Sequence, residues 1–156
     1  MSTAFHLDET DRKLLRALQA DGSASHATLA AKTGASTASC WRRIRAMEKA
    51  GVLGPTVRLV EPRHVGRDVN VFCHVRLKSQ APESIRAFER LTSARGEIME
   101  CYSMSGEWDF LLRIVVSDVA DFERFLMREL LSHPSVATAS SHFALRQMKY
   151  TTALPV

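Results

Sequence analysis

The spacing of apolar residues changes near residue 67 of this 156-residue chain, and that change limits the folds available to it. Before residue 67, apolar side chains recur every three or four positions, which is the spacing of a helix with one buried face. After it, the residues of the segment VNVFCHVRLK alternate between two sides, as in a strand. One side then carries Val71, Cys73, Val75 and Leu77. The two patterns predict two small domains, over residues 1–53 and 68–156, joined by a linker strand over 54–67.

Three helices are predicted in the first domain, because each apolar stretch has a start signal and a stop signal. The expected N-caps are Asp8, Ser25 and Ser36, and the expected stops are Gly22, Gly34 and Gly51. The second and third helices are separated only by a short turn that contains glycine. This arrangement is typical of a helix-turn-helix unit, here in a winged-helix-like domain.

The third helix, TASCWRRIRAMEKAG, has a thin apolar side made by Cys40, Ile44 and Met47, with Trp41 at its edge. Its other side is basic, because at 100° per residue Arg42, Arg45 and Lys49 fall within about 60° of one another. Arg43 lies nearer the apolar flank, where its stem can pack while its head reaches a partner. A solvated surface helix and a helix that lies against DNA both have this pattern.

If the third helix binds DNA, its N-terminal residues meet base edges and its later cations meet phosphates. Base readout is then expected from Thr37, Ala38, Ser39 and Arg42, and phosphate contact from Arg45 and Lys49. The full set of candidate DNA-binding residues is Ser36, Thr37, Ala38, Ser39, Arg42, Arg43, Arg45 and Lys49.

The charge of the chain is unevenly distributed. Residues 1–65 contain ten Lys/Arg and six Asp/Glu, whereas residues 66–156 contain eleven of each, so the whole net charge of +4 lies in the first part. An excess of this kind favours a polyanionic partner for the first domain alone.

Several classes of protein are disfavoured. The three cysteines are scattered without a CxxC pair, so we expect three small core residues in a reducing compartment and neither disulfides nor a metal site. No basic-then-apolar leader and no membrane-length apolar run is present, which predicts a cytoplasmic protein without a membrane partner. No histidine base is apparent for Cys101 and no phosphate loop is found, so we do not expect an enzyme.

The second domain is expected to have the order βαββαβ. Strands are predicted over 69–78, 97–104, 107–116 and 135–148, and helices over 81–96 and 118–134. This order is that of a ferredoxin-like sandwich, so the predicted class is α+β. Both helices cover one face of such a sheet. The apolar positions on the other face predict dimerisation.

A helix-turn-helix followed by a βαββαβ domain resembles the Lrp/AsnC family, the leucine-responsive "feast/famine" transcription regulators of bacteria and archaea. The resemblance rests on LDETDRKLLRALQADG, LAAKTGASTASCWRRIRAMEKAGVL, CYSMSGEWDFLLRIVVSD and FALRQMKYTTALPV, in this order. It implies double-stranded DNA as partner, with the third helix as recognition helix, and a nucleoid-associated protein. It also implies homodimers that assemble further, commonly to octamers, with an amino-acid effector bound where neighbouring dimers meet.

The family's effector pocket corresponds to the turn SMSGEWD and to the last strand. The resemblance implies that the backbone around Ser105 and Gly106 binds a carboxylate, that Asp109 binds an α-ammonium group, and that Met104 flanks them. Ser141 keeps a hydroxyl that is common in the family, whereas Ala139 lacks one. Judged from the residues alone, Gly106 only forms a hairpin turn and Asp109 only caps it.

We therefore expect a sequence-specific transcriptional regulator whose DNA binding or assembly is modulated by a small effector, and no other cofactor. The alternative is an architectural DNA-binding protein with little dependence on sequence or effector, because small residues beside phosphate-binding arginines fit that role too.

Overall fold

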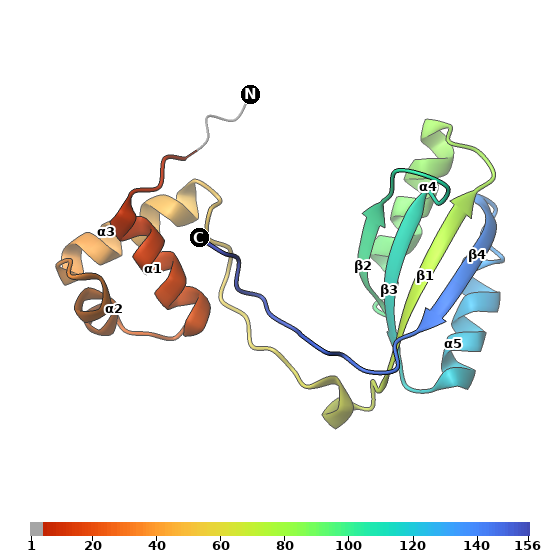
Figure 1. Ribbon diagram of the computed structural model, residues 1–156. Helices are drawn as coiled ribbons and strands as arrows, with labels where there is room; N and C mark the ends of the chain where they lie inside the picture. Colours follow the sequence, from red (N-terminus) through yellow and green to blue (C-terminus); the bar gives the residue numbers. More distant parts are fainter. Residues whose placement is uncertain (1–4) are drawn as a thin grey trace. The chain divides into compact units, whose positions relative to one another are not determined.

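The computed structural model describes residues 5–156, and the chain divides into two compact units (Figure 1). The first unit contains the chain up to Leu59 together with Lys149–Val156, and the second contains Val60–Met148. The last residues therefore belong to the first unit, although their position in the sequence predicted that they would belong to the second domain.

The first unit has three helices, α1 (Glu9–Ala20), α2 (His26–Thr33) and α3 (Thr37–Lys49). All three helices contribute to one core, whose fully or almost fully buried members include Leu14, Leu29, Cys40 and Met47. A helix of eight to thirteen residues is marginal alone, so this shared apolar core accounts for most of the helical stability.

The predicted N-caps are confirmed. Asp8 and Asp11 form a capping box at the start of α1, in which each carboxylate accepts from the backbone N–H of the other residue. The hydroxyls of Ser25 and Ser36 accept from the N–H groups of the third residue in α2 and α3 respectively. Gly34 ends α2 in the left-handed conformation, with φ of 72°.

The linker does not form the strand predicted over 54–67. No strand is assigned between α3 and β1 in the part of the chain that the structure describes, and Pro62–Val65 form a 3-10 turn that ends at Gly66. A strand needs a neighbouring backbone to bond to, and Pro55 and Pro62 each lack an N–H group.

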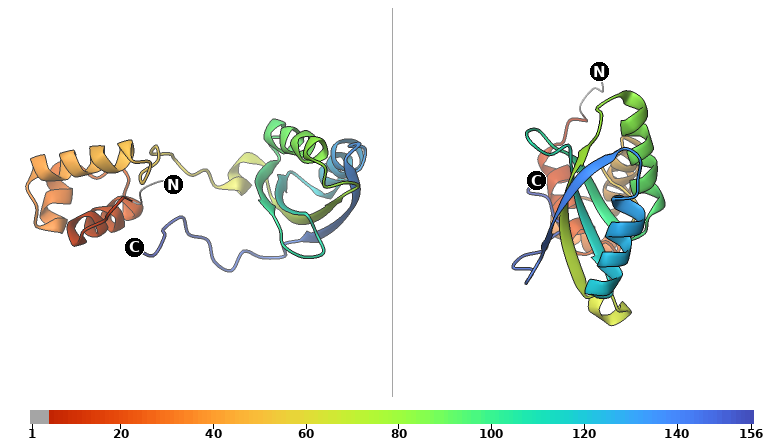
Figure 2. Two further views of the ribbon diagram at one scale, coloured as in Figure 1. Left: turned by 90° about the horizontal axis from the view of Figure 1, so that it is seen from above. Right: turned by 90° about the vertical axis from the view of Figure 1, so that its right-hand side faces the viewer.

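The second unit is a four-stranded antiparallel sheet with helices, which confirms the α+β class. In chain order its elements are β1 (Val69–Leu77), α4 (Pro82–Ala94), β2 (Ile98–Ser103), β3 (Phe110–Val116), α5 (Val119–Phe125) and β4 (Val136–Phe143). A π-helical turn over Leu126–Leu130 continues α5. The strand order is β2-β3-β1-β4, and both helices lie on one face of the sheet (Figures 1 and 2).

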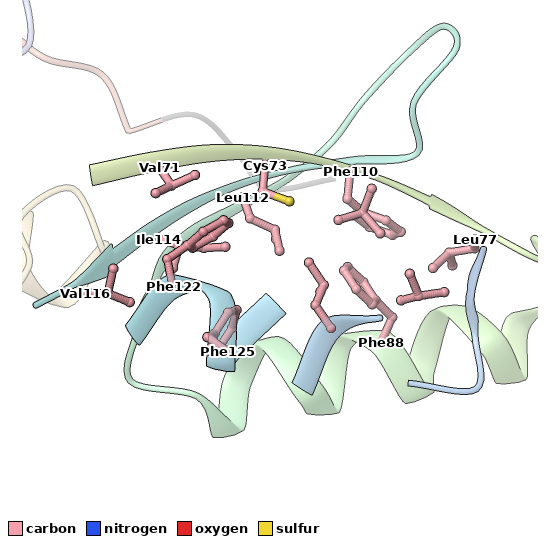
Figure 3. Packing of buried hydrophobic residues seen from close by; sticks show 13 residues of the cluster. Val71, Cys73, Leu77, Phe88, Phe110, Leu112, Ile114, Val116, Phe122 and Phe125 are labelled. Carbon is pink, nitrogen blue, oxygen red and sulfur yellow. The ribbon is translucent and has the colours of Figure 1, made fainter. Parts of the chain in front are cut away.

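The core of the second unit lies between that sheet face and the two helices (Figure 3). The register pairs Cys73 of β1 with Leu112 of β3, so the predicted inward side of β1 is buried together with the matching side of β3. Phe88 of α4 is fully buried, and its ring centroid lies 4.7 Å from that of Phe110.

None of the helices described in the second unit lies on the opposite face of the sheet. Its side chains include Phe72 and His74 of β1, and their cross-strand neighbours Arg113 and Leu111 of β3. Phe72 is 38% exposed, although it is large and apolar. We call this surface the open face.

The cysteines are only partly as predicted. Cys40 and Cys73 are buried, but Cys101 is exposed, because it lies on the edge strand β2. In the described residues there is no cluster of three or more His, Cys, Asp or Glu placed to hold a metal ion. Nor does any described helix have the length and apolar character needed to cross a membrane.

Candidate nucleic-acid interface and effector site

The outer face of α3 is exposed and basic. This face consists of exposed side chains, those of Thr37 at the start of the helix and of Ala38, Arg42, Arg45 and Lys49. Among the described residues, Arg42 and Lys49 take part in no ion pair, whereas Arg45 lies 3.1 Å from the carboxylate of Glu48. The two unpaired cations therefore make α3 attractive to an anion.

Two of the candidate contact residues mainly build the start of α3. The Ser36 hydroxyl oxygen accepts from the Ser39 N–H at 3.2 Å, and Ser39 itself is half-buried. The Ser36 hydroxyl therefore caps the helix, whereas Ser39 contributes only its backbone N–H to this bond.

Arg43 is bound within the first unit. Its Nη1 atom donates to Asp8 at 2.7 Å and to Asp11 at 2.8 Å, and Asp11 is buried. The Asp11 backbone N–H and then the Arg43 guanidinium hold the pKa of Asp8 below its ordinary value. Arg43 thus joins α3 to α1 and is not positioned as an outward-facing contact, unlike the other arginines of the helix.

Trp41 is more exposed than its predicted position at the edge of the apolar side suggested. The helical spacing put it at the edge of the apolar side, but 52% of it is exposed, and the Arg45 guanidinium lies 5.9 Å from the centre of its ring. At 100° per residue it lies about 60° from Ile44 on the apolar side and about 40° from Arg45 on the basic side. The spacing alone therefore leaves Trp41 between the two sides, and only the fold shows how far it is exposed.

The predicted effector turn connects β2 to β3. The Met104 N–H donates to the Asp109 carbonyl at 2.9 Å, which closes the turn, and Gly106 within it has φ of 117°. This backbone conformation is one that side chains other than glycine rarely adopt. Within the described residues, the N–H groups of Ser105, Gly106 and Glu107 donate no hydrogen bond.

The Asp109 carboxylate holds the end of β1. Its Oδ2 accepts from the Leu77 N–H at 2.7 Å and its Oδ1 from the Gln80 amide at 2.9 Å. The Asp109 N–H donates to the Val75 carbonyl at 3.0 Å. The chain therefore already uses Asp109 as a structural group, although each carboxylate oxygen has room for one more donor.

Ser141 is not brought to this turn by its own chain. It lies on β4 opposite Cys73, and its hydroxyl is 3.4 Å from the Cys73 sulfur, on the side of the sheet that the helices cover. The turn, by contrast, bonds to β1 at Val75 and Leu77. Four of the five predicted effector residues therefore lie together at the turn of one chain, namely Met104, Ser105, Gly106 and Asp109. Ser141 of the same chain lies apart from this turn.

A capped helix-turn-helix with a basic second helix, followed by a separate antiparallel α+β domain, defines a DNA-binding protein with an accessory domain. Residues 7–48 match the AsnC-type helix-turn-helix domain, and residues 70–154 match the Lrp/AsnC ligand binding domain. The chain belongs to the Lrp/AsnC family of transcriptional regulators.

Curated relatives match almost the whole chain. The leucine-responsive regulatory protein of Rhizobium meliloti is 36% identical over 149 residues, which cover 96% of each chain. The glutamate uptake regulatory protein of Zymomonas mobilis is 33% identical over 150 residues, covering 96% of this chain and 91% of that protein. Both relatives are regulators by name.

Two solved structures have nearly the same fold. One is a transcriptional regulator of Neisseria meningitidis in complex with L-Met, with a TM-score of 0.92 and 32% identity over 96% of this chain and 97% of that one. The other is an AsnC family transcriptional regulator of Agrobacterium tumefaciens, with a TM-score of 0.90 and 43% identity over the same shares.

Proposed function

We propose that this regulator binds specific DNA sequences by laying α3 in the major groove. The observation that carries the proposal is the exposed outer face of α3, on which Arg42 and Lys49 have no ion-pair partner among the described residues. Arginine pairs with the major-groove edge of guanine, so we assign base readout to Arg42 together with Thr37 and Ala38. Lys49 and Arg45, further along the helix, are assigned to phosphates.

The DNA-binding proposal is tested by measuring the affinity for the DNA upstream of the chain's own gene and for random DNA, at two salt concentrations. A specific regulator prefers its site by about a thousandfold or more, whereas an architectural protein binds both DNAs alike. Lys49→Ala should weaken binding to both DNAs and reduce the salt dependence, and Arg42→Ala should reduce the preference itself. Lys78→Ala, an exposed cation of the second unit, is the matched control.

We further propose a small amino-acid effector that binds at the turn between β2 and β3. The free N–H groups of Ser105, Gly106 and Glu107 are suitable donors to a carboxylate, and Asp109 retains acceptor capacity for an ammonium group. The L-Met in the Neisseria structure supports an amino acid as the ligand class. Ser141 is left out of this proposed site because its hydroxyl is turned toward Cys73.

An effector changes function only if it prefers one state of the protein. A tenfold preference for one assembly or for the DNA-bound form shifts that equilibrium by about 1.4 kcal/mol. We propose that these states are dimers formed through the open face and larger assemblies of dimers. Two-fold dimers place two α3 helices on half-sites about one helical turn, or a multiple of it, apart.

The effector proposal is tested by thermal unfolding in the presence of each of the twenty amino acids. A ligand of the folded protein raises the midpoint, and the ligand-dependent rise should disappear in Gly106→Val, which strains the turn backbone at φ of 117° and adds a side chain beside it. The matched control is Glu107→Ala, which keeps the backbone donor and should keep the rise. If no amino acid shifts the wild-type midpoint, the effector is of another class or absent.

A further inference from the structure

Trp41 is exposed in a way that the first unit does not explain. The core beside α3 is filled by Cys40 and Met47, which are both fully buried, and Trp41, on the flank of the helix between the apolar and the basic side, is 52% exposed. A tryptophan offers a large apolar surface that is costly to leave in water. Its place beside the cations of α3 makes this surface available to whatever the helix binds.

The surroundings of Trp41 indicate what that partner is. Ala38 lies one turn before it and Arg45 one turn after it on the same face, and Arg42 follows it directly. The surface is thus apolar at Trp41 and cationic around it. The major groove of DNA fits this combination, since thymine offers a 5-methyl group between the anionic phosphate strands.

A cation, Arg45, lies over the indole ring. Its guanidinium is 5.9 Å from the ring centre, and the Glu48 carboxylate accepts from the same guanidinium at 3.1 Å. The attraction between an exposed cation and an indole face is weak, but it favours this ring position before DNA arrives. Trp41 is also the fifth residue of α3, within the N-terminal half of the helix, which in this motif meets base edges.

We propose that Trp41 is a specificity-determining residue that contacts the 5-methyl group of a thymine in each half-site. The inference rests on the proposed DNA-binding function. It goes further because it names the base and the chemical group that are read.

The first test uses fluorescence, because the chain has only two tryptophans, Trp41 and Trp108. In full-length Trp108→Phe, Trp41 is the sole reporter, and its emission should change on titration with DNA in parallel with binding. In Trp41→Phe, the remaining Trp108 should show no such change. Emission from Trp41 that stays constant while DNA binds would overturn the inference and leave the proposed function intact.

The second test removes the methyl group alone. A site selected from random DNA by the wild-type protein is remade with deoxyuridine at each thymine in turn. We expect one position per half-site where the wild type loses about three- to tenfold in affinity. Trp41→Ala should bind the two DNAs equally, whereas Arg42→Ala should bind both more weakly and keep the difference.

Three outcomes are distinct. If the wild type binds no DNA, the proposed function fails and the inference fails with it. If it binds DNA but every thymine tolerates deoxyuridine, or if Trp41→Ala retains the full discrimination, Trp41 does not read a methyl group. Circular dichroism of Trp41→Ala checks that the helices are retained, which its exposed position leads us to expect.

Discussion

At the scale of single residues, the start of α1 binds the one arginine of α3 that faces it, Arg43. Asp8 and Asp11 form the capping box and also receive the Arg43 guanidinium, so the same two carboxylates cap one helix and anchor another. Neutralising one of them loosens the link between α1 and α3, while the cap itself can be kept by asparagine.

Asp8→Asn provides a test that depends on pH. Hydrogen bonding by the Asp11 N–H and by Arg43 lowers the pKa of Asp8 below 3.8 in the folded protein. A carboxylate with a lowered pKa stabilises the fold above its unfolded pKa, and this contribution is lost as the pH falls through the folded pKa. We expect wild type to exceed Asp8→Asn in urea stability at pH 5, with a difference that shrinks below pH 3.8. A difference independent of pH would contradict the ion-pair explanation.

Asp109 gives a second prediction at this scale. Alanine has no acceptor oxygen, so Asp109→Ala leaves the Leu77 N–H and the Gln80 amide without this partner. We expect a loss of about 1–3 kcal/mol in the free energy of unfolding of the second unit without any effector. Denaturant unfolding measures it, with Glu107→Ala as the neighbouring control. A variant as stable as wild type would leave Asp109 free for the ligand alone.

At the scale of elements, the turn between α2 and α3 depends on Gly34. Its φ of 72° is left-handed, and a β-carbon there would meet no atom within 4 Å, so the cost of a side chain is backbone strain alone. We expect Gly34→Ala to destabilise the first unit by about 1 kcal/mol and Gly34→Asn by clearly less, because asparagine tolerates this conformation. Thermal unfolding of both variants checks the order. Equal losses would indicate that the strain argument is wrong.

Helices and strands could be predicted from the sequence wherever the pattern that specifies the element lies within that one segment. The alternation of β1 predicted its buried side, and the caps Asp8, Ser25 and Ser36 predicted three helix starts, because these signals are local. The roles of Arg43 and Asp109 were not predictable in this way. Arg43 lies 32 positions from its partner Asp11, and Asp109 lies 32 positions from its partner Leu77. Only the fold reveals such distant contacts.

At the scale of the whole molecule, the chain passes between the two units twice. It leaves the first unit near Leu59 and returns to it at Lys149. There the Gln19 side chain exchanges two hydrogen bonds with the backbone of Leu154, and the Val156 carbonyl accepts from Arg16. The unit that contains α3 is thus joined to the second unit by two chain segments.

The open face of the sheet leads to the last prediction, which concerns assembly. Phe72 lies in the middle of that face on the central strand β1, opposite Arg113, and is 38% exposed. In a dimer formed through this face the ring would be buried, so Phe72→Glu would remove that apolar contact and place a carboxylate of each subunit in the interface. We expect a folded monomer by sedimentation velocity, with DNA affinity reduced because one subunit contacts only one half-site. Met127→Glu, an exposed apolar position that is not on the sheet, should remain a dimer. A dimeric Phe72→Glu protein would move the interface away from the open face.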